Sequence, residues 1–265
     1  MVAIGSVATG LARADSDIDS VVFLDPLDLY ITPAESIWRA ADDTHHSIFT
    51  DDSSLGRDGI QLDTHRVDLA VWRSPDFEWP EHRRAELADG WVAYDRTGEV
   101  AELVAQRTSM QDSDRQTILD QVLIEVAGVL PEDPAWSWRT LGPVEAFDRL
   151  QSAYESLARG LFAYNHKWRP WRSRALRGLR QLRYLPDAFR ADGGAAATTA
   201  GADTYDAYDR RARVLRGMLD QLVARLQLDR TYGTDPVTEA FIRINDEPGR
   251  AWNMDAWVKR RRTVS

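Results

Sequence analysis

The segment GSVATGLARADSDIDSVVF, residues 5–23, contains a glycine and a serine, then ten further residues, and then two aspartates. Asp17 and Asp19 are separated by a single residue, and a short apolar run follows them at once. Alternate residues of an extended strand point to the same face, so we expect the two carboxylates side by side at the start of a buried strand. Two like charges that close repel each other, and a cation between them relieves the repulsion.

The glycine and the serine favour a functional interpretation of this segment. A bare Asp-x-Asp before a strand is more often a polar turn than a metal site. Gly5 permits a close approach of the backbone, and Ser6 offers a hydroxyl and an N–H to a phosphate oxygen. Phosphoryl transfer needs metal ions and donors that hold the phosphates in line. Mg²⁺ fits this set because it prefers carboxylates together with phosphate oxygens.

A third carboxylate from a neighbouring strand would complete a metal site, and two residues compete for that role. Asp68 lies in the strand-like run RVDLAVW, where a charge is costly to bury without a partner. Asp63 differs from it by an odd number of positions, so on one regular strand the two face opposite ways. The flanks of Asp68 look more central to a sheet, and we therefore expect Asp68 to be the third ligand.

The composition limits the classes of function. The chain has 265 residues, 43% of them hydrophobic, which is enough for one large domain or two ordinary ones. It has no cysteine, which excludes disulfides and thiolate metal sites and makes a cytoplasmic location the default expectation. No basic, apolar leader is recognised at the start, and no apolar run approaches a membrane span. The net charge of −9 disfavours nonspecific binding of nucleic acid and favours cationic small molecules.

The first 105 residues alternate between strand-like and helix-like segments, which is typical of an α/β layer. Strands are expected at residues 2–4, 19–24 and 90–94, and residues 60–72 are expected to contain one long strand or a hairpin. Helices are expected at residues 33–41 and 99–106. From residue 106 to residue 265 the apolar residues recur at three- and four-residue steps instead, which indicates a helical bundle.

Three amphipathic helices are expected in this second part, over residues 147–164, 176–185 and 214–226. The small, glycine-rich segment of residues 192–203 is expected to be a loop, and residues 259–265 a tail. The fold class is therefore α+β, with a small α/β domain at residues 1–105 and a helical domain at residues 106–265.

The N-terminal features resemble the nucleotidyltransferase superfamily of DNA polymerase β. Gly5-Ser6, Asp17, Asp19 and Asp68 match its Gly-Ser pair, its Asp-x-Asp and its later acidic residue in an apolar strand. Gly10 and Arg13 match a pattern of its small bacterial members. The resemblance covers residues 1–105. It implies a mixed sheet, two Mg²⁺ ions on the three aspartates, and contact between Gly5-Ser6 and the triphosphate of ATP or another NTP.

The helical half resembles the substrate domain of the aminoglycoside adenylyltransferase branch in architecture. It contains a segment rich in basic residues, from Tyr164 to Arg183. Lys167 and Arg169 are candidates to reach the triphosphate, whereas the arginines from Arg174 onward are expected to pair with surface acids. Glu145 is the preferred catalytic base among the acids beside the first helical stripe, although an ordinary solvated acid is the alternative.

The expected activity is Mg²⁺-dependent transfer of a nucleotidyl group, AMP from ATP, to a hydroxyl of a small acceptor such as an aminoglycoside-like antibiotic. Two alternatives stay open. One is a related enzyme with a protein or RNA acceptor, for which the arginine-rich segment is the support. The other is a non-catalytic nucleotide-binding protein of the same fold, which the three aspartates disfavour.

Overall fold

The computed structural model describes residues 1–49, 59–197, 204–245 and 258. It divides the chain into two compact units, residues 1–109 and 110–265, which we call the sheet unit and the helical unit. The sequence pattern placed the boundary after residue 105, within the helix that runs from Glu99 to Thr108. Among the described residues, no helix combines the length and the apolar character needed to cross a membrane.

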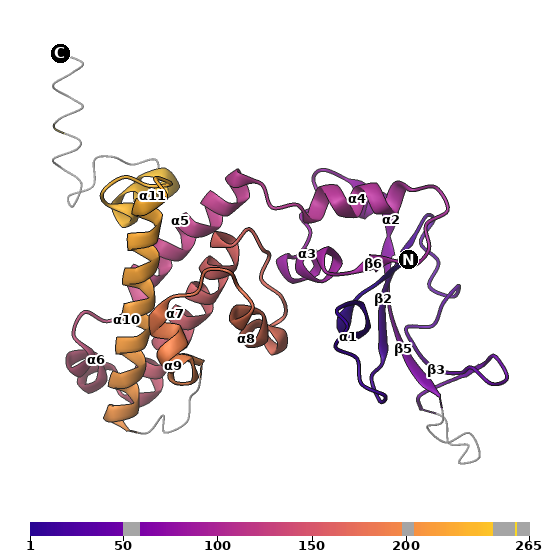
Figure 1. Ribbon diagram of the computed structural model, residues 1–265, viewed down its shortest axis with the longest axis horizontal. Coiled ribbons are helices and arrows are strands. Elements are labelled where there is room, and N and C mark those ends of the chain that lie inside the picture. Colours follow the sequence, from indigo (N-terminus) through magenta and orange to yellow (C-terminus); the bar gives the residue numbers. More distant parts are fainter. Residues whose placement is uncertain (50–58, 198–203, 246–257, 259–265) are drawn as a thin grey trace. The chain divides into compact units, whose positions relative to one another are not determined.

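The sheet unit contains a six-stranded mixed sheet in the order β4-β3-β5-β2-β1-β6 (Figure 1). Its central strands β2 and β5 run parallel, and the other neighbouring pairs are antiparallel. The six strands are β1 (Val2–Ala3), β2 (Ile18–Leu24), β3 (Glu35–Arg39), β4 (Thr44–His46), β5 (Ile60–Asp68) and β6 (Trp91–Val92). The predicted mixed sheet is therefore present, and with the helical unit it confirms the α+β fold class.

One face of this sheet carries the core of the unit. Val21 and Phe23 alternate along β2, Val67 lies on β5, and all three are buried. They pack in one cluster with residues of α2 (Leu69–Arg73), α3 (Glu81–Ala88) and α4 (Glu99–Thr108). Trp72 and Trp79 lie in the same cluster with ring centroids 4.7 Å apart. This core holds β2 and β5 side by side, which matters because the candidate site lies on these two strands.

One expectation for the sheet unit is wrong, and another is confirmed. Residues 33–41 were expected to form a helix, but β3 occupies residues 35–39 and pairs with β4 and β5. The hydrogen bonds to two neighbouring strands outweigh a weak local helix preference. Residues 60–72 contain one long strand, as expected, because β5 spans residues 60–68, and the chain then turns into α2 at Asp68.

The helical unit has α7 (Pro143–Tyr164) and α10 (Tyr205–Leu228) as its longest helices. Their buried residues include Leu150 and Leu157 on α7 and Leu215 and Leu222 on α10, at helical spacing. The other described helices are α5 (Asp112–Val129), α6 (Pro134–Leu141), α8 (Arg172–Arg180), α9 (Asp187–Ala197) and α11 (Pro236–Asn245). The first and third predicted stripes thus correspond to α7 and α10.

The other expectations for this half need correction. The helix predicted over residues 176–185 begins at Arg172 and ends at Arg180. Leu182 and Leu185 therefore lie in the loop after the helix, and their side chains are buried. The loop predicted at residues 192–203 is helical up to Ala197, because α9 continues through a kink at Asp192. Residues 198–203 and the predicted tail at 259–265 lie outside the described residues.

Candidate functional site

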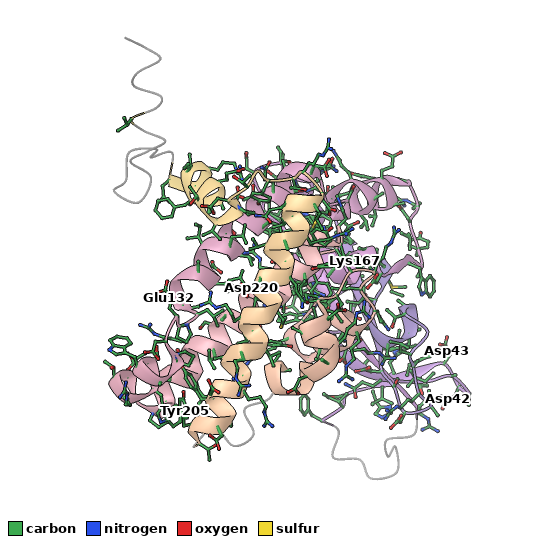
Figure 2. The ribbon with its side chains drawn as sticks, turned by 60° about the vertical axis from the view of Figure 1, so that its left-hand side comes forward. Asp42, Asp43, Glu132, Lys167, Tyr205 and Asp220 are labelled. Atoms are coloured by element: carbon green, nitrogen blue, oxygen red, sulfur yellow. The ribbon has the colours of Figure 1, made fainter. Side chains whose placement is uncertain are left out.

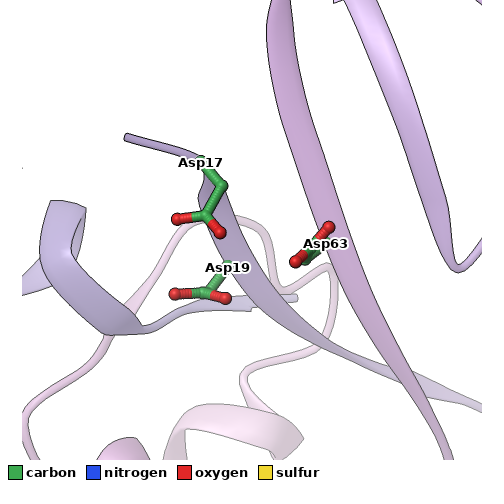
Figure 3. Close-up of side chains that lie close together, drawn as sticks. All are labelled: Asp17, Asp19 and Asp63. Carbon is green, nitrogen blue, oxygen red and sulfur yellow. The ribbon is translucent and has the colours of Figure 1, made fainter. Parts of the chain in front are cut away.

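Asp17, Asp19 and Asp63 bring their carboxylates together where β2 begins to pair with β5 (Figure 3). One carboxylate oxygen from each lies within 4.8 Å of the others, and all three residues are half-buried. Asp19 of β2 is the register partner of Asp63 of β5, and Asp17 immediately precedes β2. We call this group the aspartate triad. Three acids this close repel one another, so the arrangement suits a divalent cation with oxygen ligands.

Gly5 lies directly against the triad. It opens the short helix α1 (Gly5–Ala8) with φ of 76°, in the left-handed region. A Cβ placed there would lie 2.0 Å from Oδ2 of Asp19. The amide of Ile4 also donates to the carbonyl of Asp19 at 3.0 Å, which fixes the two segments together. Only a glycine satisfies both the backbone angle and the close approach.

Ser6 carries the hydroxyl that the sequence pattern assigned to a phosphate. Its Oγ is buried and has no hydrogen-bond partner among the described residues. A buried hydroxyl without a partner is costly, and such a group calls for an explanation. Next to a triad that suits Mg²⁺, a phosphate oxygen is a partner of the right chemistry. The carboxylates of Asp17, Asp19 and Asp63 therefore fit a divalent metal ion, and the hydroxyl of Ser6 is available as a donor to a ligand.

Asp68 is not the third acid, which corrects the expectation from sequence. It pairs with Leu24 at the far end of β2, five residues beyond Asp63, or about 16 Å along the strand. Its Oδ1 accepts hydrogen bonds from the amides of Ala70 and Val71, at 2.8 and 3.3 Å. Asp68 is thus the N-cap of α2. An aspartate directly before an apolar run is a helix-start signal, and that signal could have redirected the choice to Asp63.

Arg83 is a neighbour of the triad that no sequence motif marks. It lies on α3 and forms an ion pair with Glu86, 2.9 Å between Nη1 and Oε2. Burial lowers the pKa of Arg83, while the charges of Glu86 and Asp19 raise it. The charge of Asp19 therefore acts on the guanidinium of Arg83, which Glu86 already pairs. Position on a short helix gives no hint of this proximity, so sequence alone could not have found it.

The residues predicted from the helical half lie in or beside α7. Glu145 is exposed in the first turn of α7. Lys167, labelled in Figure 2, is exposed in the loop after that helix. Arg169, in the same loop, forms an ion pair with Glu155 of α7. Glu155 also accepts from Nε of Arg172 at 3.0 Å. The assignments of Glu145 as base and of Lys167 and Arg169 as phosphate contacts stay predictions.

Comparisons with known proteins add little. No protein-family model matches the chain, and no curated protein sequence matches it. Its structure is similar to the crystal structure of a nucleotidyltransferase-like protein from Exiguobacterium sibiricum, with a TM-score of 0.39 and 10% sequence identity. That match covers 96% of this chain and 76% of the other. So distant a likeness supports no statement about activity, which has to come from the residues of the site.

Proposed function

We propose that the chain is a Mg²⁺-dependent nucleotidyltransferase that moves AMP from ATP to a hydroxyl of a small-molecule acceptor. The observation that carries the proposal is the aspartate triad with Gly5 packed against Asp19 and the buried, unpartnered hydroxyl of Ser6. A chain that needed only a stable sheet would gain nothing from three carboxylates within 4.8 Å of one another.

The division of labour follows from the positions of the groups. Asp17, Asp19 and Asp63 would hold the metal ions, which stabilise the charge on the attacking and leaving oxygens. Ser6 donates to a phosphate oxygen and helps to keep the phosphates in line. The acceptor oxygen forms a bond to the α-phosphorus, the bond from that phosphorus to the bridging oxygen breaks, and pyrophosphate leaves. Glu145 is the candidate base that takes the proton of the hydroxyl.

A macromolecular acceptor is the second candidate, and a specific observation favours it. Arg177 and Arg180 are exposed on α8 and form no ion pair with the described residues, so the expected pairing with surface acids does not account for them. Such free cations suit RNA or an acidic protein. A non-catalytic role is the weaker alternative, because the triad is complete.

A pair of matched variants tests the proposal. Asp63→Asn removes a triad charge, and we expect it to weaken Mg²⁺-dependent ATP binding at least about ten-fold and to abolish nucleotidyl transfer. Its melting temperature should stay the same or rise, because the repulsion within the triad falls. Asp68→Asn keeps an N-cap side chain at the far end of the strand and should leave binding intact. Calorimetry with ATP, with and without Mg²⁺, measures binding by both variants, and thermal melts give their melting temperatures.

Transfer itself is followed with ATP labelled at the α-phosphate. One set of reactions contains a panel of aminoglycosides and other small polyhydroxyl compounds, and the other contains tRNA or cell lysate. Label on a small molecule supports the first proposal, and label on RNA or protein alone supports the second candidate. Wild-type protein that binds no ATP with Mg²⁺, or a loss of binding in Asp68→Asn but not in Asp63→Asn, would refute the metal site.

A further inference from the structure

Polar contacts with Glu155 and Gln151 of α7 link arginines from three different segments of the helical unit. Tyr154 lies on α7 with 7% of its surface exposed. Burial raises the pKa of its hydroxyl, and the charges of Arg169, Arg211, Arg172 and Arg180 all lower it. These arginines come from the loop after α7, from α8 and from α10. Contacts with Glu155 and Gln151 thus link Arg169, Arg172 and Arg211, and the charge of Arg180 also acts on Tyr154, although the protein as a whole carries a net charge of −9.

Only part of this positive charge is compensated. Glu155 forms ion pairs with two of these arginines, Arg169 and Arg172. Gln151 donates to the same carboxylate at 2.7 Å. The oxygens of Glu155 are therefore already shared among three partners. Arg180 forms no hydrogen bond or ion pair with the described residues. The chain from residue 164 to residue 186 contains no aspartate or glutamate that could offset it.

Arg211 is the least expected member of the group. It lies on α10 with 1% of its surface exposed, and burial lowers its pKa. Its Nε donates to the carbonyl of Ala196 at 3.1 Å, and its Nη2 donates to Oε1 of Gln151 at 2.6 Å. Its Nη1 is buried and has no hydrogen-bond partner among the described residues. This buried guanidinium donates only to a neutral amide and a carbonyl, and one of its nitrogens has no partner. Burying such a charge destabilises the fold unless an anion binds to it.

We propose that this cluster, Tyr154 with Arg169, Arg172, Arg180 and Arg211, binds a phosphate group. Guanidinium groups present several donors in a plane and pair with phosphate in two-pronged hydrogen bonds, and the tyrosine hydroxyl adds another donor. The phosphate belongs either to the triphosphate of the nucleotide or to a phosphorylated acceptor. A cationic acceptor such as an aminoglycoside would be repelled at this place. Binding of phosphate here needs neither the aspartate triad nor the proposed reaction.

The test measures binding of inorganic tripolyphosphate to the full chain in EDTA, so that the aspartate triad cannot hold the anion through a metal. We expect calorimetry to show binding and the melting temperature to rise with tripolyphosphate. Arg180→Gln should weaken the binding about ten-fold, the loss typical of one charge-assisted hydrogen bond. Arg177→Gln is the matched control, one turn away on α8 and also exposed. Its charge is not among those that act on Tyr154, and its effect should be under about three-fold.

Two further variants address the buried members. Tyr154→Phe removes only the hydroxyl and should weaken tripolyphosphate binding. Arg211→Met should melt at the same or a higher temperature without the anion, since it removes a buried and incompletely paired charge, and should lose the tripolyphosphate-induced shift. Should Arg211→Met fail to fold, Arg180→Gln and Tyr154→Phe decide the matter. No binding to the wild type in EDTA, or equal losses in Arg177→Gln and Arg180→Gln, would overturn the proposal.

Kinetics then separates the two sources of phosphate. A rise in the KM for ATP in Arg180→Gln, at constant KM for the acceptor, assigns the cluster to the triphosphate of the nucleotide. The reverse pattern assigns it to a phosphate on the acceptor. Either result supports the cluster as a phosphate site, and tripolyphosphate binding in EDTA tests it even if no transfer is ever observed.

Discussion

Single residues decide whether the candidate site can form, and Gly5 shows this most directly. Its positive φ and its contact with Asp19 are separate constraints, because the first depends on the backbone and the second on the space beside it. Gly10 has a similar φ of 69°, yet a Cβ there would meet no atom within 4 Å. A substitution at Gly10 therefore tests backbone strain alone, whereas a substitution at Gly5 tests backbone strain together with a steric clash at the triad.

We predict that Gly5→Ala and Gly10→Ala cause similar backbone strain but have very different effects on ATP binding. Both place an alanine in the left-handed region, which costs about 1–2 kcal/mol. Gly5→Ala also drives a methyl group into the Asp19 carboxylate, so Mg²⁺-dependent ATP binding should fall at least about ten-fold. Gly10→Ala should bind as the wild type does. Thermal melts and ATP calorimetry check both, and equal binding by the two variants would contradict the role of Gly5.

The third acid shows the limit of prediction at this scale. Asp17 and Asp19 could be paired from the period of two along a strand, which needs only local sequence. Choosing between Asp63 and Asp68 required the register of β5 against β2, and register is set by tertiary packing. Apolar flanks around Asp68 looked like a central strand but belong to the start of α2. Arg169 could be named as a phosphate candidate from its basic segment, but Arg83 and the other members of the cluster around Tyr154 depend on contacts between distant segments and could not be predicted.

Whole elements are joined in the helical unit by a small number of polar contacts, and α11 is the clearest case. Asp120 of α5 is buried and accepts from Nε and Nη2 of Arg243 of α11, at 2.7 and 2.9 Å. The hydroxyl of Tyr232, just before α11, donates to the same carboxylate. The Arg243 guanidinium also lies over the Tyr232 ring, 4.6 Å from its centroid. These contacts attach the last described helix to the core.

Removing the guanidinium should loosen α11 much more than removing a surface pair. Arg243→Met leaves the buried carboxylate of Asp120 with Tyr232 alone, and we expect a loss of about 2–3 kcal/mol in the free energy of unfolding. Glu239→Gln is the control, since Glu239 meets the same arginine at 3.6 Å on the helix surface. It should cost about 0.5 kcal/mol or less. Urea denaturation of the full chain compares them, and similar losses would contradict the anchoring role of Asp120.

The same elements explain which helices the sequence could predict. α7 and α10 each bury one continuous stripe, so their apolar residues repeat with a helical period. α5 packs against both α7 and α11, and its apolar positions spread around more of the helix. A broad apolar surface has little periodicity, and Asp120 interrupts it further. A helix that packs against two other helices therefore lacks the periodic apolar pattern by which sequence alone predicts a helix.

At the scale of the whole molecule, the helical unit contains all the described tyrosines whose pKa is raised. Burial is the largest cause in each, and for Tyr184 it raises the pKa to about 12. The other four are Tyr154, Tyr164, Tyr208 and Tyr232. An unfolded tyrosine ionises near its ordinary pKa of 10, while the folded one keeps its proton to higher pH. Above pH 10 the unfolded state therefore binds fewer protons than the folded state. The contribution of these tyrosines to the free energy of unfolding is complete below pH 10 and decreases above it.

We therefore predict that the free energy of unfolding of the helical unit decreases as the pH rises from 10 through about 12, the pKa of Tyr184. Tyr184 contributes at most about 1.4 kcal/mol per pH unit, and less because its hydroxyl is partly exposed. Tyr184→Phe loses the hydrogen bond to the carbonyl of Gln221, 3.0 Å long, and should be less stable than the wild type at pH 8. Its deficit should shrink above pH 10, because phenylalanine has no proton to release. Urea denaturation at pH 8, 10 and 11.5 measures the difference, and parallel curves for the two proteins would show that Tyr184 ionises equally in the folded and unfolded states.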